Sequence, residues 1–475
     1  MPHLEGVSRD MAIQFPPTLD EYITADNPVR FIDAFVDQLD LQGLGFPRVI
    51  AATEGRPAYA PGDLLKLYIY GYLNRVRSSR LLERETQRNV EVMWLLKKLT
   101  PDHKTIADFR KDNPKALRQV CRDFSQLCKA LELFGGELVA IDGSKFLAVN
   151  SRSRNFSREK LARALNDLEE KIARYLTELD QQDEHEPDLP PVTADALKVK
   201  IAHLRRRQEH YQTLQHQLEQ RGEAQLSLTD PDSRSMPAGQ GTSVGYNAQT
   251  AVDSKYKLIV AHEVTNAVTD QDQLAPMAIE AKQALGVTTL DATADKGYYD
   301  GEAVKQCLAQ GITPYLPKPH TSINQKRGLY TKDDFSYDRN RDCYRCPQGA
   351  ELGFRFATVE NGRPMRYYAT TACRTCAAQA LCTSNKGGRR ITRWADEHLL
   401  DEMAERVKAH PEIVQQRKEL SEHPFGTIKR TMVQAYFLLK GLVKVNAEMS
   451  LTVLAYNLKR AITILGVPKL IAAVT

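Results

Sequence analysis

The stretch Glu137-Leu-Val-Ala-Ile-Asp-Gly-Ser-Lys145 decides the fold of this chain. Leu138 to Ile141 form an apolar run that is too short for a helix, and Gly135-Gly136 breaks the chain just before it. The run therefore predicts a buried β-strand, and Asp142 stands where that strand reaches the surface. Taken alone, an aspartate at such a place favours a structural turn over a catalytic site.

Two further acids stand in comparable places. Leu290-Asp-Ala-Thr-Ala-Asp-Lys-Gly-Tyr298 is another short, mostly apolar run, and it leads to Asp295 before a glycine turn. Glu422 lies in Ser421-Glu-His-Pro-Phe-Gly-Thr-Ile-Lys-Arg430, which precedes a long helical pattern. The lone aspartate thus becomes one of a set of three acids.

These motifs resemble the three acids of the DDE transposases. The group they resemble most is the bacterial insertion-sequence transposases that carry a Cys-rich insert before the catalytic glutamate. The resemblance runs from about Ala58 to Arg460, and its most specific parts are Glu422-His-Pro-Phe-Gly426 and Pro101-Asp-His-Lys-Thr-Ile-Ala-Asp-Phe-Arg110. It implies that Asp142, Asp295 and Glu422 are catalytic and hold two Mg²⁺ (or Mn²⁺) ions. Two such ions about 4 Å apart can activate the attacking oxygen of a phosphodiester reaction and stabilise the leaving one.

The order of predicted elements indicates the fold class. The order is strand, helical-hairpin insert, two strands, helix, strand, helix, strand, Cys-rich insert and helix. This is the layout of an α/β, ribonuclease-H-like catalytic domain, expected over residues 134–475. Leucines and isoleucines at heptad-like steps on both sides of a Pro- and acid-rich linker (181–191) predict the hairpin, an insert of two long helices over 157–224. A spacer, a dimer contact and a DNA contact all remain open for the hairpin.

Residues 1–133 predict an all-α domain that binds DNA. Helical patterns begin at Pro28, near Pro61 and at Pro101, the last expected to run to about Leu131. From Lys66 to Arg122 there are fourteen Lys/Arg against six Asp/Glu, a local excess that suits a phosphate backbone. A solvated helical face explains that excess about as well. The candidate DNA contacts, which recur at short steps, are Arg75, Arg77, Arg80 and Arg84.

A cysteine cluster predicts a structural zinc site. The chain has eight cysteines, and five of them fall within forty residues. Two Cys-x-x-Cys pairs match a zinc ribbon over residues 335–390, in which four thiolates bind Zn²⁺ tetrahedrally. The expected ligands are Cys343, Cys346, Cys373 and Cys376, with Cys382 as an alternative. Cys121, Cys128 and Cys307 lie in helical patterns and are expected in the core.

Lys429 follows Glu422 by seven residues, which is about two turns of a continuous α-helix. The resemblance implies that this lysine contacts a phosphate at the transposon end. It also implies an arginine before the glutamate, for which Arg417 and Lys418 are both candidates. The register of Arg417 is off by one, and Gln415 stands where the family has a tyrosine.

The leading hypothesis is an enzyme that binds the terminal inverted repeats of an insertion sequence and cuts and joins double-stranded DNA, with a homodimer expected on DNA. Two alternatives are a catalytically inactive DNA-binding protein derived from a transposase and a related nuclease without a joining step. A binder needs none of the three acids, which argues against the first alternative. No apolar run reaches roughly 18 residues and the N-terminus shows no secretory pattern, so we expect no membrane partner and no secretion. The resemblance implies a bacterial cytoplasmic, nucleoid-associated protein.

Overall fold

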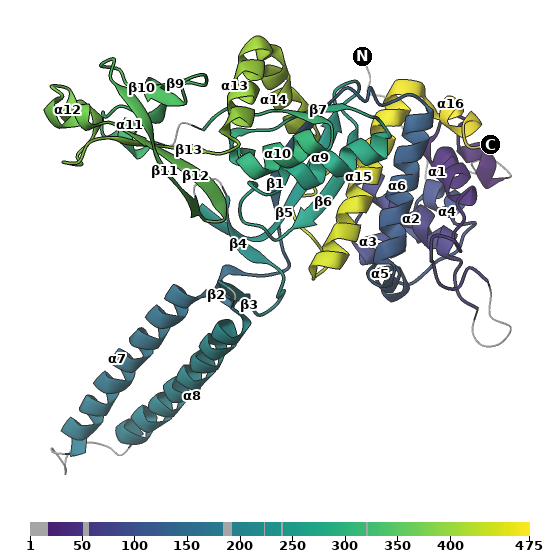
Figure 1. Cartoon of the computed structure of the whole chain (residues 1–475). Helices are drawn as coiled ribbons and strands as arrows, with labels where there is room; N and C mark the ends of the chain where they lie inside the picture. Colours follow the sequence, from purple (N-terminus) through teal and green to yellow (C-terminus); the bar gives the residue numbers. More distant parts are fainter. Residues whose placement is uncertain (1–17, 51–56, 184–191, 223, 239–240, 320–321) are drawn as a thin grey trace, which may run out of the picture.

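A mixed β-sheet forms the centre of the molecule (Figure 1). The computed structural model describes residues 18–50, 57–183, 192–222, 224–238, 241–319 and 322–475. The sheet has the order β4-β5-β1-β7-β8, and β6 pairs with the same edge of β5 as β4 does. Its strands are β1 Leu138–Leu147, β4 Arg234–Ala238, β5 Gly241–Asp253, β6 Ile259–Thr265, β7 Leu290–Thr293 and β8 Ile312–Tyr315.

The sheet combines two kinds of pairing, and β1 takes part in both. β1 runs antiparallel to β5 and parallel to β7, and β7 runs parallel to β8. The expected strand at Leu138 therefore exists, and it continues without a break through Asp142 to Leu147, as the sequence also predicted. The predicted mixed α/β, ribonuclease-H-like layout is confirmed.

Each face of β1 belongs to a different hydrophobic core. Val139 and Ile141 join α9 (Leu274–Leu285) and α10 (Gly301–Ala309) in one core. Phe146 joins the N-terminal and C-terminal helices in the other. Because successive side chains of a strand point to opposite faces, Asp142 shares the face of Phe146. The acid thus projects toward the helical core.

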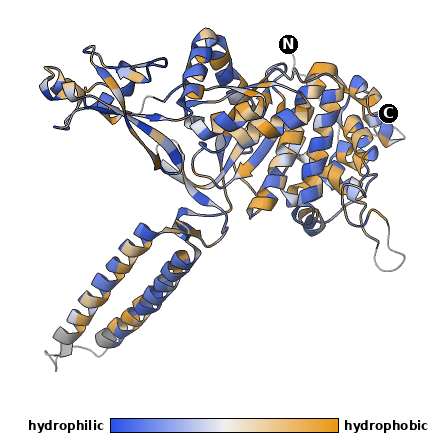
Figure 2. Cartoon of the chain, viewed as in Figure 1, coloured by the Kyte–Doolittle hydropathy of each residue, from blue (hydrophilic) through white to orange (hydrophobic). Residues whose placement is uncertain are grey.

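The N-terminal part of the described chain is helical, as predicted, but its core is shared. α15 packs against α2 and α6, and one apolar cluster spans these helices and the strands β1, β5 and β6. Figure 2 shows that orange, apolar residues are frequent in these helices, alongside blue, hydrophilic ones. The helices concerned are α1 Pro28–Asp37, α2 Pro61–Leu73, α3 Ser79–Arg88, α4 Val90–Leu95, α5 His103–Asp112, α6 Pro114–Ala130, α15 Leu442–Leu465 and α16 Val467–Ala472.

The single helix expected from Pro101 to about Leu131 is wrong in one respect. It is divided at Asn113 into α5 and α6, because proline disfavours the helical conformation of the residue before it. Pro114 then opens α6 as its first residue, where the missing N–H has no helical partner to lose.

The first insert projects from the body as a helical hairpin (Figure 1). It consists of β2 (Asn155–Ser157), α7 (Arg158–Asp183), α8 (Val192–Arg221) and β3 (Gln225–Ser227). β2 and β3 pair at its base, where Phe156, Leu161 and Leu218 form a small separate core. Residues 184–191 of the expected linker lie outside the described residues, as does the N-terminus up to residue 17.

The second insert is a five-stranded antiparallel sheet that lies on the same side of the body as the hairpin. Its order is β13-β12-β11-β10-β9, and aromatic side chains including Tyr344 and Tyr368 fill its core. No helix within the described ranges is long and apolar enough to span a membrane. The remaining elements are α11 Ile323–Lys326, β9 Ser336–Asp338, β10 Cys343–Arg345, β11 Glu351–Glu360, β12 Arg363–Ala369, α12 Gln379–Cys382, β13 Arg390–Trp394, α13 Glu397–Ala409 and α14 Pro411–Gly426.

Candidate active site

Asp142 is a largely buried carboxylate in the middle of β1. It pairs across the ladder with Thr250 of β5, and its Oδ1 accepts a 2.8 Å hydrogen bond from the N–H of Gly143. Burial, together with the negative charge of Asp295, raises the pKa of Asp142 to about 6. The Gly143 N–H, the Ser421 hydroxyl and the positive charge of Arg417 oppose this shift. The carboxylate therefore lacks full solvation and is suited to a cation.

Asp295 approaches Asp142 from the neighbouring parallel strand. It follows β7 and caps the short 3₁₀ helix η3 (Lys296–Tyr298), accepting a 2.7 Å hydrogen bond from the N–H of Gly297. Because β1 and β7 are parallel neighbours, the residues that follow equivalent positions meet at one edge. The structure thus brings together two of the three predicted acids.

Glu422 lies on a helix that packs against β1, but its side chain is exposed. Ser421 and Arg417, four residues apart on α14, face Asp142. Consecutive helical residues are rotated by about 100°, so Glu422 lies on an adjacent face. Of the two candidates for the arginine before the glutamate, it is Arg417 that faces the acid. Within the described chain, no three His, Cys, Asp or Glu side chains are grouped closely enough to hold a metal ion.

Lys429 lies beside Asp142. Two turns of a continuous α-helix would place Lys429 on the same face as Glu422, but the helix is not continuous there. After α14 the chain forms a π-helix, η6 (Thr427–Thr431), whose wider turn changes the phase of the side chains. Lys429 Nζ donates to Ser144 Oγ at 2.7 Å and to the carbonyl of Lys145 at 2.8 Å. Burial lowers the pKa of Lys429, and the charge of Lys145 lowers it further.

The donor set around Asp142 fits a hydrated divalent cation. Mg²⁺ is commonly held by one or two carboxylates and keeps several waters. Asp142 and Asp295 supply two carboxylates. The hydroxyl of Thr250, directly across the ladder from Asp142, is buried without a hydrogen-bond partner in the described structure. A coordinated water could satisfy that hydroxyl.

The predicted DNA-contacting arginines divide into two groups. Arg75, Arg80 and Arg84 are exposed, and the last two lie one turn apart on α3. Arg77 is only 7% exposed. Its guanidinium pairs with the fully buried Glu448 of α15 and lies over the ring of Tyr436. Arg77 therefore connects the N-terminal helices to the C-terminal helices inside the protein. The prediction that it contacts a DNA phosphate is corrected.

The cysteines of the second insert also fall into two groups. Cys346, Cys373, Cys376 and Cys382 line one small cavity of about 30 Å³. Burial raises the pKa of the Cys382 thiol, and the charges of the other three cysteines raise it further. Cys343 does not line this cavity, and its thiol contacts Glu351. A side chain at Gly388 (φ +94°) would come within 2.6 Å of Cys373 Cβ, so the glycine permits the close approach of the chain there.

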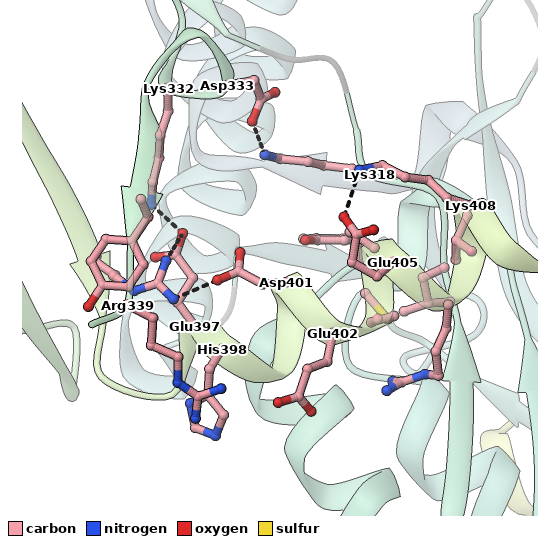
Figure 3. Close-up of a pocket in the computed structure, with 18 of the residues that line it drawn as sticks. Lys318, Lys332, Asp333, Arg339, Glu397, His398, Asp401, Glu402, Glu405 and Lys408 are labelled. Carbon is pink, nitrogen blue, oxygen red and sulfur yellow. Dashed lines mark hydrogen bonds and ion pairs between the residues drawn. The ribbon is translucent and has the colours of Figure 1, made fainter. Parts of the chain in front are cut away.

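A large cleft lies elsewhere, between the second insert and α13 (Figure 3). It measures about 1140 Å³ and contains neither Asp142 nor Asp295. Figure 3 shows Lys332 directed at Glu397 and Lys318 directed at Asp333, and both are ion pairs. Because acids neutralise many of its basic side chains, its size alone does not mark it as a reaction site.

Two family models match the sequence. One, described as "Transposase domain (DUF772)", matches residues 17–112, and the other, "Transposase DDE domain", matches residues 345–462. The second match contains Glu422, Lys429 and most of the Cys-rich insert. This chain belongs to the DDE transposases. It is accordingly an enzyme of phosphoryl transfer, and the resemblance to insertion-sequence transposases is confirmed.

Other comparisons add little about this transposase. No curated protein matches the chain. A solved structure titled "Cryo-EM structure of piggyBac transposase synaptic complex with hairpin DNA (SNHP)" covers 93% of this chain and 75% of its own, with 9% sequence identity. Its TM-score of 0.32 is too low to carry an argument.

Several polar residues near the acids of the transposase were not predicted from the sequence. Asp270, Asn247 and Gln249 gather on the opposite face of the sheet from Asp142, and Thr250 and Ser421 line the acid itself. The polar residues of β5 were the sequence signal that could have found them. Asn247, Gln249 and Thr250 are themselves buried in this almost wholly buried strand, and buried polar groups require hydrogen-bond partners.

We expect Asp142→Asn to stabilise the metal-free transposase at pH 8. The folded pKa of about 6 lies above the ordinary value of 3.8, so the charge destabilises the fold once the pH exceeds both values. The difference corresponds to at most about 3 kcal/mol. The gain in melting temperature over wild type should shrink when the pH is lowered from 8 to 5. Melting in EDTA at both pH values measures this, and a variant less stable than wild type at pH 8 would contradict it.

Proposed function

We propose that this transposase cleaves and joins DNA at the terminal inverted repeats of its element, with Asp142, Asp295 and Glu422 as the acids that hold Mg²⁺ or Mn²⁺. The observation that supports this most strongly is the desolvated Asp142 carboxylate beside Asp295. When bound, two divalent ions activate the attacking oxygen and stabilise the leaving one.

The remaining groups of the site have separate roles in this proposal. Arg417 balances part of the negative charge on Asp142. Lys429, whose ammonium lies beside Ser144, contacts a phosphate of the transposon end. Glu422 is exposed on the helix that packs against β1, so its carboxylate reaches the metal only after a change in α14 or in its own rotamer.

We further propose that residues 1–133 act as the DNA-binding region and 134–475 as the catalytic region. The exposed Arg75, Arg80 and Arg84 are suited to phosphate contacts, and none of the three forms an ion pair within the described structure. A homodimer on DNA and a location with the bacterial nucleoid complete the proposal. The helical hairpin, which projects from the body, is suited to contact the second subunit or the DNA.

Removing any proposed metal ligand should abolish strand cleavage. Metal ions contribute several kcal/mol to such reactions, so Asp142→Ala, Asp295→Ala and Glu422→Ala should each lower the rate by about 100-fold or more. A labelled DNA fragment carrying the element's end, incubated with Mg²⁺, measures cleavage, and a gel shift measures binding. Binding should persist.

A matched control is Glu419→Gln. Glu419 lies on α14, the helix of Glu422. It is exposed, and its carboxylate forms an ion pair with Lys257 outside the acid site. Cleavage at the wild-type rate by any of the three alanine variants would remove that residue from the proposal. Cleavage by the wild-type protein without any joining would favour the nuclease alternative.

Neutralising the exposed arginines should weaken DNA binding in a salt-dependent way. Each lost phosphate contact lowers the slope of log K against log salt by about 0.9. Arg80→Gln with Arg84→Gln should therefore reduce the slope by about two units. Arg88→Gln on the same helix is the control, because its guanidinium already pairs with Glu85. An unchanged slope in the double variant would exclude α3 as the DNA contact.

We propose that the second insert binds one structural Zn²⁺ through Cys346, Cys373, Cys376 and Cys382. The four thiols surround one cavity, whereas Cys343 contacts Glu351. Zinc–sulfur bonds measure about 2.3 Å, so the ion would draw the four sulfurs together. Cys382 thus replaces Cys343 in the expected ligand set, and the five-stranded sheet replaces a simple two-knuckle ribbon.

Zinc content decides between the two ligand sets. We expect Cys382→Ser to lose the metal and Cys343→Ser to keep one zinc per chain, as measured by elemental analysis of purified protein. The pair is well matched, because both variants replace one thiol of the same insert by a hydroxyl. Retention of zinc by Cys382→Ser together with loss by Cys343→Ser would contradict the assignment.

A further inference from the structure

Asp270 is held at the centre of a polar cluster behind the acid site. It lies between β6 and α9, and its Oδ1 accepts hydrogen bonds from Lys145 Nζ at 3.3 Å, Asn247 Nδ2 at 2.5 Å and Gln249 Nε2 at 2.7 Å. Asn247 and Gln249 are completely buried. An ionised carboxylate can only accept hydrogen bonds, so it suits three converging donors.

The cluster lies directly against the strand that carries Asp142. In the ladder, Gly143 faces Gln249 and Lys145 faces Asn247. A Cβ atom at position 143 would lie 2.3 Å from Gln249 Nε2 and 2.7 Å from Asp270 Oδ1. A side chain at position 143 would therefore have to displace the ends of these side chains. The glycine that follows Asp142 lets the cluster pack directly against β1.

Asp270 fixes the orientation of the Gln249 side chain. Because Asp270 takes the amide N–H of Gln249, the amide oxygen points the other way, where it accepts a 2.5 Å hydrogen bond from the hydroxyl of Tyr298. Tyr298 is only 1% exposed. Burial holds the pKa of Tyr298 well above its ordinary value, so the hydroxyl remains a donor.

Tyr298 in turn belongs to the segment that carries Asp295. It is the last residue of η3, the 3₁₀ helix that Asp295 caps. The charges of Asp270, Asp142 and Asp295 all act on Tyr298, which places the hydroxyl among the three acids. A chain of two hydrogen bonds thus connects Asp270 through Gln249 to the short helix after Asp295.

We propose that Asp270 is a positioning residue for Asp295, acting through Gln249 and Tyr298 to hold the Asp295 carboxylate at the acid site. The role rests on the proposed function, because it assumes that Asp295 binds a divalent cation. Residues that orient metal ligands commonly change metal affinity by about 10- to 100-fold when they are removed.

Two variants remove the connection at different points. In Asp270→Asn one carboxylate oxygen becomes an NH₂ donor and the other becomes a neutral oxygen with two lone pairs. The side chain therefore cannot accept hydrogen bonds from all three partners. Tyr298→Phe removes one hydroxyl and keeps the buried ring, which leaves a testable protein if Asp270→Asn does not fold. Asp272→Asn is the matched control, because Asp272 lies in the same loop and is exposed. Asp295→Asn serves as the reference for loss of the ligand itself.

Two measurements separate positioning from general stability. Amide hydrogen exchange in the metal-free full chain should become faster at residues 295–299 in Asp270→Asn and Tyr298→Phe, and remain unchanged in Asp272→Asn. Titration with Mn²⁺, followed by electron paramagnetic resonance, should show an affinity about 10-fold weaker in the first two variants. DNA binding should not change.

Wild-type exchange at 295–299 in both variants would overturn the positioning role. Faster exchange with unchanged Mn²⁺ affinity would overturn it as well, because Asp295 would then bind the ion without support. Wild-type Mn²⁺ affinity in Asp295→Asn would instead refute the metal role of Asp295 in the proposed function, whatever the exchange data show.

Discussion

The structure depends on placing a carboxylate in the middle of a strand that is closed by a hydrophobic core on each face. β1 is bonded to β5 on one side and β7 on the other, and its alternating side chains enter two cores. Such a strand offers Asp142 little water, which is why its pKa rises to about 6. Burying a charge is costly unless it is paired, and in the proposed function a divalent cation would supply that pairing. The charge on Asp142 thus destabilises the metal-free fold, and binding of a cation would relieve that cost.

The two inserts leave the central sheet at different points of the chain. The hairpin lies between β1 and β4, and the Cys-rich sheet lies between β8 and α13. Both project on the side away from the N-terminal helices (Figure 1). The N-terminal helices, by contrast, share a core with α15 and are tied to it by the buried Arg77–Glu448 pair. Removing one member of a buried pair commonly costs about 3–5 kcal/mol, so this region is built into the catalytic body.

The sequence predicted the elements whose signals are local. The apolar runs at Leu138 and Leu290 became β1 and β7, and the heptad-like leucines became α7 and α8. The resemblance grouped Asp142 with Asp295, and the parallel pairing of β1 with β7 is the structural reason why the two acids meet. The match of Glu422-His-Pro-Phe-Gly426 supplied the family, which spacing alone could not.

The rest depended on contacts between distant residues. Arg77 shares its spacing with exposed arginines, and only the packing of α15 shows that it is buried. The π-helix changes the phase of Lys429, and a count of seven residues assumes a regular α-helix. Cys343 and Cys346 lie in one Cys-x-x-Cys pair, yet Cys343 lies on β10 and its thiol contacts Glu351 while Cys346 follows the strand and lines the cavity. Asp270 has no motif of its own, since its role comes from three donors on two other strands.

The central claim is that a divalent cation binds between Asp142 and Asp295. Fe²⁺ can replace Mg²⁺ at such a site, and with ascorbate and peroxide it cuts the protein backbone close to where it is bound. Mass spectrometry of the fragments then locates the ion without any knowledge of the DNA substrate. The account predicts cuts near residues 142 and 295 that excess Mg²⁺ suppresses. Cuts confined to other regions, or cuts near these acids that Mg²⁺ does not affect, would contradict it.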